Sequence, residues 1–211
     1  MSHRKLMSKL FRTIARLSGA GLVLAGVAAL AFTVPAPGPA HADDSTPPDV
    51  PTNLQPLAGN RLFYVAHAVG TQDYVCLSTG WASPAYGPQA TLFDQENEQV
   101  LTHFLSPNPD EANTARPTWQ DSRDSSTIWA NPIPGASYTP DPTAIPWLLL
   151  KVVGNEEGPT GGDRLTGTTF IQRLNTTGGL KPTGACTEGA KALVPYTADY
   201  YFYKSTAGGN E

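Results

Sequence analysis

The sequence predicts an all-β domain, a sandwich or a barrel, with long loops rich in proline and glycine. Short runs of strand-forming residues alternate with glycine and proline turns, which is typical of these two folds. The 20 glycines and 20 prolines among 211 residues are numerous enough for many turns. After the amino-terminal segment, no stretch has the spacing of a long amphipathic helix, and no repeat of fixed period is visible.

Eight segments are expected to form strands. They are residues 62–69, 72–77, 90–93, 98–104, 127–130, 145–153, 165–174 and 192–203. Residues 165–174 alternate between two faces, as in a half-buried strand, whereas 145–153 is nearly all apolar, as in a strand buried on both faces. A short helix over 93–103 is the competing interpretation, because Leu92 and Val100 would share one helical face.

The remaining segments are expected to be irregular. Residues 107–127 are predicted to be mostly loop, and residues 131–145 contain four prolines. Residues 43–60 have four prolines and few large apolar side chains, so we expect an extended tail that leads into a β domain over 61–205. Residues 206–211 are predicted to be a flexible carboxy-terminal tail.

The first 42 residues have the three parts of a secretory signal peptide. A basic start is followed by an apolar run over 17–34 and by the triplet Ala40-His41-Ala42, so cleavage is expected after Ala42. An uncleaved membrane anchor is the alternative, because the run is close to the ~18 residues that a membrane span needs. The prolines after the run favour cleavage, and the lack of adjacent arginines favours the general secretory route. The protein is therefore expected to be secreted, without stable membrane insertion after cleavage.

Removal of this segment changes the charge of the protein. The whole chain has a net charge of −4, whereas the remaining 169 residues carry nine basic and 18 acidic side chains, a net charge of −9. Such a charge suits a soluble exported protein. It argues against nucleic acids and anionic lipids as partners, because both need basic surfaces.

Cys76 and Cys186 are the only cysteines. In an oxidising compartment an even pair most simply forms a disulfide. Two alternatives stay open from the residues alone: a pair of buried free thiols, or a catalytic cysteine, which would need a nearby base and would be exposed to oxidation. No Cys-x-x-Cys spacing supports a metal site.

Few residues are candidates for catalysis. No Gly-x-Ser-x-Gly, dinucleotide-binding or Walker pattern occurs, so no cofactor is expected. His67 lies in an apolar predicted strand and is interpreted as structural, whereas His103 ends a predicted strand, where sites often form. The catalytic candidates are His103 with Asp121 or Asp124. No metal site is expected, because these histidines lack the spacing of a ligand pair.

Aromatic residues in or beside predicted loops are the candidate ligand-binding groups. They are Trp81, Trp119, Trp129 and Tyr86. Their rigid π faces could stack on a sugar or on a small apolar molecule at low entropic cost. The alternative interpretation is that each tryptophan packs at one end of the β core.

Four motifs occur in one order along the chain. They are Gly-Thr-Gln-Asp-Tyr-Val-Cys at 70–76, Ile-Pro-Trp-Leu-Leu at 145–149, Phe-Ile-Gln-Arg-Leu-Asn-Thr at 170–176 and Tyr-Thr-Ala-Asp-Tyr-Tyr-Phe-Tyr at 196–203. In these motifs the chain resembles, over about residues 50–205, a family of secreted bacterial and fungal proteins catalogued as domain of unknown function 3455. The resemblance implies an exported single domain with a Cys76–Cys186 pair. It implies no established activity and assigns no catalytic residue.

The leading hypothesis for function is a non-catalytic binding or surface-associated module. Its loop aromatics would contact a carbohydrate or a small apolar ligand. One alternative is an extracellular hydrolase-type enzyme that uses His103 with Asp121 or Asp124. A second alternative is a structural envelope or stress protein.

Overall fold

The computed structural model describes residues 48–82 and 87–206, which are nearly all β. Two short 3-10 helices, η1 (Thr52–Leu54) and η2 (Pro109–Glu111), accompany nine strands in these residues. The strands are β1 (Asn60–Leu77), β2 (Gly80–Ala82), β3 (Pro88–Phe93), β4 (Gln99–Asn108), β5 (Thr114–Asp121), β6 (Thr127–Tyr138), β7 (Trp147–Glu156), β8 (Thr168–Gly178) and β9 (Lys191–Ser205). The predicted all-β class is confirmed.

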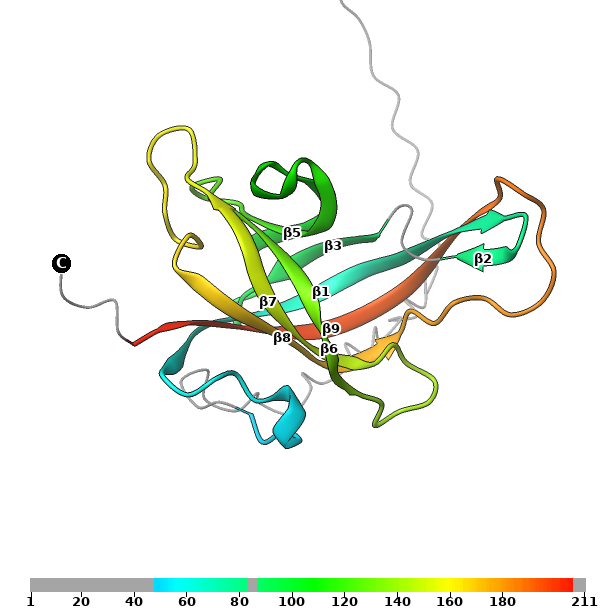
Figure 1. Ribbon diagram of the computed structural model, residues 1–211, viewed down its shortest axis with the longest axis horizontal. Coiled ribbons are helices and arrows are strands. Elements are labelled where there is room, and N and C mark those ends of the chain that lie inside the picture. The colour runs from blue at the N-terminus through cyan, green and yellow to red at the C-terminus, as the bar shows by residue number, and fades with distance from the viewer. Residues whose placement is uncertain (1–47, 83–86, 207–211) are drawn as a thin grey trace, which may run out of the picture. The chain divides into compact units, whose positions relative to one another are not determined.

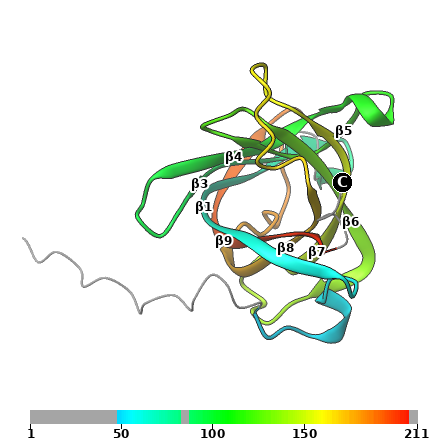
Figure 2. The ribbon, with the colours of Figure 1, turned by 90° about the vertical axis from the view of Figure 1, so that its left-hand side faces the viewer.

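The strands close into an antiparallel barrel (Figures 1 and 2). From β3 to β9, each strand pairs with the next strand along the chain, and β1 pairs with both β3 and β9. Eight strands therefore form a ring, and β2 is an extra strand paired to the end of β1. The longest ladder joins β1 to β9, from Asn60↔Ser205 to Val75↔Lys191. Of the two architectures that the sequence allows, the protein has the barrel.

The barrel interior is packed around aromatic side chains. Alternate residues of β9, namely Tyr196, Ala198, Tyr200 and Phe202, are all buried, as the two-residue period of a strand requires. Trp119 of β5 is also fully buried, with its ring 5.5 Å from that of Tyr200 and 6.4 Å from that of Phe202 between centroids. These contacts join opposite parts of the barrel wall across its interior.

The segment before β1 packs against the outer surface of the barrel. Val50 and Leu54 are buried in a second apolar cluster with Leu149, among others. The Leu54 carbonyl accepts a hydrogen bond from Nε2 of Gln172 at 2.8 Å, and Gln172 accepts one from the Tyr203 hydroxyl at 2.7 Å. This differs from the extended tail predicted over 43–60, because the few apolar side chains of residues 48–59 are enough to hold the segment on the barrel. The predicted signal peptide, residues 43–47 and residues 207–211 lie outside the described residues.

Replacing Leu54 tests this packing. Leu54→Ala is expected to lower the free energy of unfolding by about 2–4 kcal/mol, because it removes a fully buried side chain and leaves a cavity. Denaturant unfolding followed by circular dichroism measures the change. The control is Leu57→Ala, whose side chain is 71% exposed and whose loss should cost less than about 0.5 kcal/mol. Equal stabilities of the two variants would contradict the packing of this segment on the barrel.

Strand β5 corrects the prediction that residues 107–127 are mostly loop. It pairs with β4 along its whole length, from Asn108↔Thr114 to Leu101↔Asp121. The helix considered over 93–103 is also wrong, because β3 and β4 are joined there by a turn. In that turn Oδ1 of Asp94 accepts the backbone N–H groups of residues 96 and 98.

Strand β6 corrects the prediction that residues 131–145 are wholly irregular. It continues to Tyr138 through two prolines, and its register against β7 shifts between Pro132 and Ser137. Its pairing with β5 ends earlier, at Trp129. Proline lacks a backbone donor, so a strand tolerates it where the ladder shifts or where an edge is unpaired. The prolines therefore mark an interruption within β6 and not its end.

A disulfide joins Cys76 to Cys186, as the cysteine count and the resemblance both predict. It connects the end of β1 to the long connection between β8 and β9, across 110 residues of sequence. Backbone hydrogen bonds from Cys76 to Ala190 and from Gly189 to Cys76, both 2.8 Å, hold the same connection. The alternatives of free thiols and a catalytic cysteine are thereby excluded.

Candidate functional site

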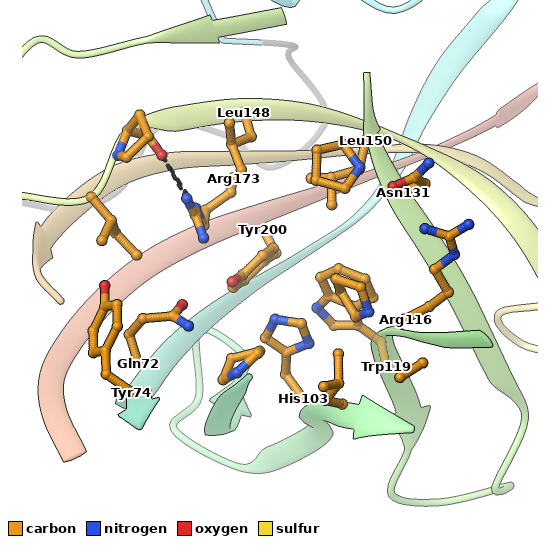
Figure 3. Close-up of a pocket in the computed structure, with 17 residues that line it drawn as sticks. Gln72, Tyr74, His103, Arg116, Trp119, Asn131, Leu148, Leu150, Arg173 and Tyr200 are labelled. Carbon is orange, nitrogen blue, oxygen red and sulfur yellow. Dashed lines mark hydrogen bonds between the residues drawn. The ribbon is translucent and has the colours of Figure 1, made fainter. Parts of the chain in front are cut away.

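A partly open cavity of about 390 Å³ lies within the barrel (Figure 3). Its wall is built from residues of the eight strands of the ring and of the connection between β6 and β7. Residues that line it include Gln72, Tyr74, His103, Leu105, Arg116, Pro117, Trp119, Asn131, Pro132, Ile145, Leu148, Leu150, Arg173 and Tyr200. Its size is in the range of small-molecule sites, which are about 300–1,000 Å³ and mostly apolar.

Strand periodicity explains why these side chains meet. Gln72 and Tyr74 are two residues apart on β1, so both face the interior. His103 and Trp119 are register partners on β4 and β5, so they project from the same face of the sheet. Their rings stack with centroids 4.0 Å apart and planes 13° from parallel. Tyr200 of β9 meets His103 edge to face, with centroids 5.2 Å apart.

Part of the cavity wall lies where the pairing of β5 with β6 stops. The two strands pair at three positions, from Thr118↔Trp129 to Gln120↔Thr127. Next to this short ladder, Pro117 of β5 and Pro132 of β6 line the cavity. Neither residue has an N–H group with which to extend the ladder. At this place, therefore, side chains and not paired backbone form the boundary of the cavity.

His103 is a neutral polar group within the cavity wall. It is 3% exposed, and its Nδ1 lies 2.8 Å from the carbonyl oxygen of Thr118. Because a carbonyl oxygen can only accept, Nδ1 carries the proton and Nε2 keeps a lone pair. The pKa of His103 is lowered to about 3, mainly by burial; the bond to Thr118 opposes this shift, and the charge of Arg173 adds to it. A ring with such a pKa is a poor general base near neutral pH.

Arg173 places a positive charge beside the cavity. Its Nη2 and Nε donate to the Pro146 carbonyl at 2.8 and 3.3 Å, which fixes the guanidinium group (Figure 3). In the part of the chain that the structure describes, no carboxylate lies within 4.0 Å of this guanidinium. Burial raises the pKa of Tyr74 and of Tyr200, while the charge of Arg173 opposes both shifts.

The two predicted carboxylate partners of His103 do not line its cavity. Asp121 Oδ1 accepts the backbone N–H groups of Arg123 and Asp124 at 2.8 and 3.1 Å, and its Oδ2 lies 3.5 Å from Nε of Arg164. Asp124 accepts hydrogen bonds from the backbone and hydroxyl of Ser126. Burial raises the pKa of Asp124, but these bonds and one from the backbone of Arg164 outweigh it and lower the value. Both carboxylates hold the β5–β6 turn against the β7–β8 connection.

The predicted aromatic residues are separated in the structure. Trp119 lines the cavity from within β5. Trp129 lies in β6 and donates from Nε1 to the Ser106 hydroxyl at 2.9 Å, away from the cavity lining. Trp81 lies in β2 opposite Cys76, and Tyr86 lies outside the described residues. The expectation that these tryptophans lie in or beside loops is corrected: Trp119 and Trp129 lie in strands of the barrel wall, and Trp81 lies in the extra strand β2.

The family of the chain follows from comparison with known proteins. A family model described as "Protein of unknown function (DUF3455)" matches residues 57–204, from just before β1 to the penultimate residue of β9. The chain belongs to this family. The comparison with curated proteins and the comparison with solved structures each found no match. Membership in DUF3455 confirms the resemblance seen in the motifs and carries no activity with it.

Sequence reasoning missed most of the polar groups around the cavity of this DUF3455 domain. Gln72, Tyr74, Arg173 and Tyr200 were not among the expected site residues. For Arg173 a signal existed, since the alternation of residues 165–174 places an arginine on the same face as Ile171, which is fully buried. A single cationic side chain on the buried face of a predicted strand is a better indicator of a site than a tryptophan in a predicted loop.

Three further observations concern the described residues of the DUF3455 domain. Among the described residues there is no group of three or more histidine, cysteine, aspartate or glutamate side chains arranged to hold a metal ion. The same residues contain no helix long and apolar enough to cross a membrane. His67, interpreted as structural, has its Nδ1 2.7 Å from Oδ1 of Asp199.

Proposed function

We propose that this DUF3455 protein is a non-catalytic binding protein that holds a small, largely apolar molecule inside its barrel. The observation that carries the proposal is the cavity of about 390 Å³ beside Trp119 and Tyr200. Closed barrels of eight strands have just enough interior for side chains or for one small ligand. Here part of that interior is left open. Its accessible wall includes the half-buried side chains of Leu105, Pro117 and Leu148, with the buried rings of Trp119 and Tyr200 next to them.

The composition of the cavity wall favours an apolar ligand over a carbohydrate. Leu105, Pro117, Leu148 and Leu150 offer no polar partner, and the Trp119 ring is stacked on His103. A sugar would bring several hydroxyl groups into this space, and each hydroxyl without a partner costs about 1–3 kcal/mol. We therefore prefer the apolar alternative of the two ligand classes that the sequence suggests.

The hydrolase alternative has less support. It needs His103 to act as a base beside Asp121 or Asp124, but both carboxylates are engaged at the β5–β6 turn. The pKa of about 3 also leaves His103 a weak proton acceptor.

The proposal includes secretion. Its support is the disulfide between Cys76 and Cys186, a bond that persists in oxidising compartments. The signal-peptide pattern of the first 42 residues agrees with it.

Filling the cavity tests the binding function. The wild-type protein is expected to bind the neutral fluorophore N-phenyl-1-naphthylamine saturably, at one molecule per chain. Leu148→Trp should weaken this binding at least tenfold, because the larger side chain occupies the space that Leu148 leaves. Fluorescence titration measures both affinities.

The control is Val69→Trp, because Val69 is 57% exposed and does not line the cavity. Circular dichroism shows whether each variant keeps its fold, and Leu148→Phe supplies a smaller increase in volume if the tryptophan is not tolerated. Absence of saturable binding to the wild type, or equal binding to the folded cavity variants, would overturn the proposal.

A further inference from the structure

We propose that the ligand carries a carboxylate group, which the guanidinium of Arg173 binds at the polar end of the cavity. This inference rests on the proposed binding function and names the chemical class of its ligand: a small monocarboxylate with an apolar body. The first support for it is the charge balance around Arg173.

Arg173 differs from the other cationic side chains that form hydrogen bonds in the described part of the chain. Arg116 makes a two-pronged contact with Glu111, with both distances 2.8 Å. Arg123 lies 3.2 Å from Glu98, and Arg164 lies 3.5 Å from Asp121. Arg173 instead donates to one carbonyl oxygen, which supplies no full negative charge. A partly buried guanidinium that lines a cavity without a described carboxylate partner is suited to an anion from outside the chain.

Several polar groups of the cavity lie near this arginine. In Figure 3, Arg173, Gln72 and Tyr74 lie at one end of the cavity, while Trp119 and Leu150 lie at the other together with Arg116 and Asn131. The charge of Arg116 is already paired with Glu111. The Tyr74 hydroxyl donates to the Gly179 carbonyl at 2.6 Å. Its only proton is therefore committed to this hydrogen bond, which also fixes the position of the hydroxyl oxygen. The Gln72 side chain has an amide N–H₂ that can donate to a second carboxylate oxygen.

The other end of the cavity suits an apolar body. Half-buried Leu105 and Pro117 line the cavity there; they are register partners two positions along from His103 and Trp119, whose stacked rings are buried beside them. Leu150 of β7 also lines this part of the cavity. His103 is neutral, so it places no second charge beside the apolar part of the ligand. A molecule with one anionic end and one apolar end would therefore match the two ends of the cavity.

Three ligands that share a ten-carbon alkyl group test the inference on the full-length protein. They are decanoate, decanol and decylamine, each used below its aggregation concentration and measured by displacement of N-phenyl-1-naphthylamine. The wild-type protein is expected to bind decanoate at least tenfold more tightly than decanol, and decylamine more weakly than either. Arg173→Met should remove the preference for decanoate and leave the affinity for decanol within twofold. Arg173→Lys should keep part of the preference, because it keeps the charge but loses the planar fork.

The matched control is Arg61→Met, which removes an exposed arginine outside the cavity and should change no affinity. If Arg173→Met does not fold, the wild-type protein still provides a test. Its binding of decanoate, but not of decanol, should weaken as the pH falls through the ordinary carboxylic-acid pKa of about 4–5.

The outcomes separate this inference from the proposed function. Equal affinity of the wild type for decanoate and decanol would overturn the carboxylate inference and leave the apolar cavity in place. A preference for decanoate that survives in Arg173→Met would overturn the role of Arg173. If none of the three ten-carbon ligands bound, and the neutral fluorophore did not bind either, the proposed function itself would be overturned.

Discussion

Loss of the Cys76–Cys186 disulfide is expected to lower the free energy of unfolding by about 4–5 kcal/mol. The bond closes a loop across 110 residues, and in the chain-entropy model a loop of that length removes this much freedom from the unfolded chain. A domain with a typical stability of about 5–15 kcal/mol would be left near the limit of folding. Denaturant unfolding of the Cys76→Ala, Cys186→Ala double variant measures the loss.

Reduction of the wild-type protein is the control for this experiment. Cys76 is only 1% exposed, so its replacement also disturbs packing, whereas a reductant breaks the bond and keeps both side chains. The reduced wild type should show the loss that is due to the bond alone, and the double variant should lose at least as much stability. A reduced protein as stable as the oxidised one would contradict the expected contribution of the bond.

Acid is expected to destabilise the protein through His103. Burial lowers its pKa to about 3 in the folded protein, whereas the unfolded chain has the ordinary value near 6.5. Between these two values the unfolded state binds a proton that the folded state does not, so stability falls as the pH falls. The expected loss from this one group is about 1.4 kcal/mol per pH unit, or about 3 kcal/mol between pH 6.5 and pH 4. Well above pH 6.5 both states bind no proton at this group, so it no longer makes stability depend on pH.

His103→Asn isolates this contribution. The asparagine amide can replace Nδ1 as a donor to Thr118 and does not titrate. Denaturant unfolding at several pH values should show a stability curve that is flatter for the variant than for the wild type between pH 6.5 and 4. Carboxylates with lowered pKa values, among them Asp124 and Asp141, destabilise both proteins in acid, so the comparison rests on the difference in slope. Equal slopes would show that His103 is not the titrating group.

The fold class could be predicted because strand periodicity and turn residues are local signals. Residues 145–153 and 165–174 have patterns that depend on the two faces of one strand, and both became strands of the barrel. Strand β5 could not be predicted in this way, because the sequence Thr-Ala-Arg-Pro-Thr-Trp-Gln-Asp has no clear alternation. It is a strand because β4 offers a partner edge along its whole length, which is a tertiary effect.

The candidate site was less predictable than the fold. Tyr200 and Arg173 come from neighbouring strands, whereas His103 and Trp119 come from the other side of the barrel, so only closure of the sheet brings the four together. The prediction from sequence found His103 and Trp119 but paired His103 with carboxylates that are close in sequence. In a barrel the residues that face one another across the interior are far apart along the chain.

The pairing of β1 with β9 has a consequence for how the protein folds. These are the first and last strands among the described residues, and their ladder joins residues that are as much as 145 positions apart, from Asn60 to Ser205. Such long-range pairing costs loop entropy before it returns any contact energy, so folding on the slow timescale of milliseconds to seconds is expected. A chain that has made β1 but not yet β9 presents two unpaired edges, on β1 and on β8, which are templates for pairing with other chains. The 15 residues of β9 therefore decide whether a newly made chain closes on itself or joins its neighbours.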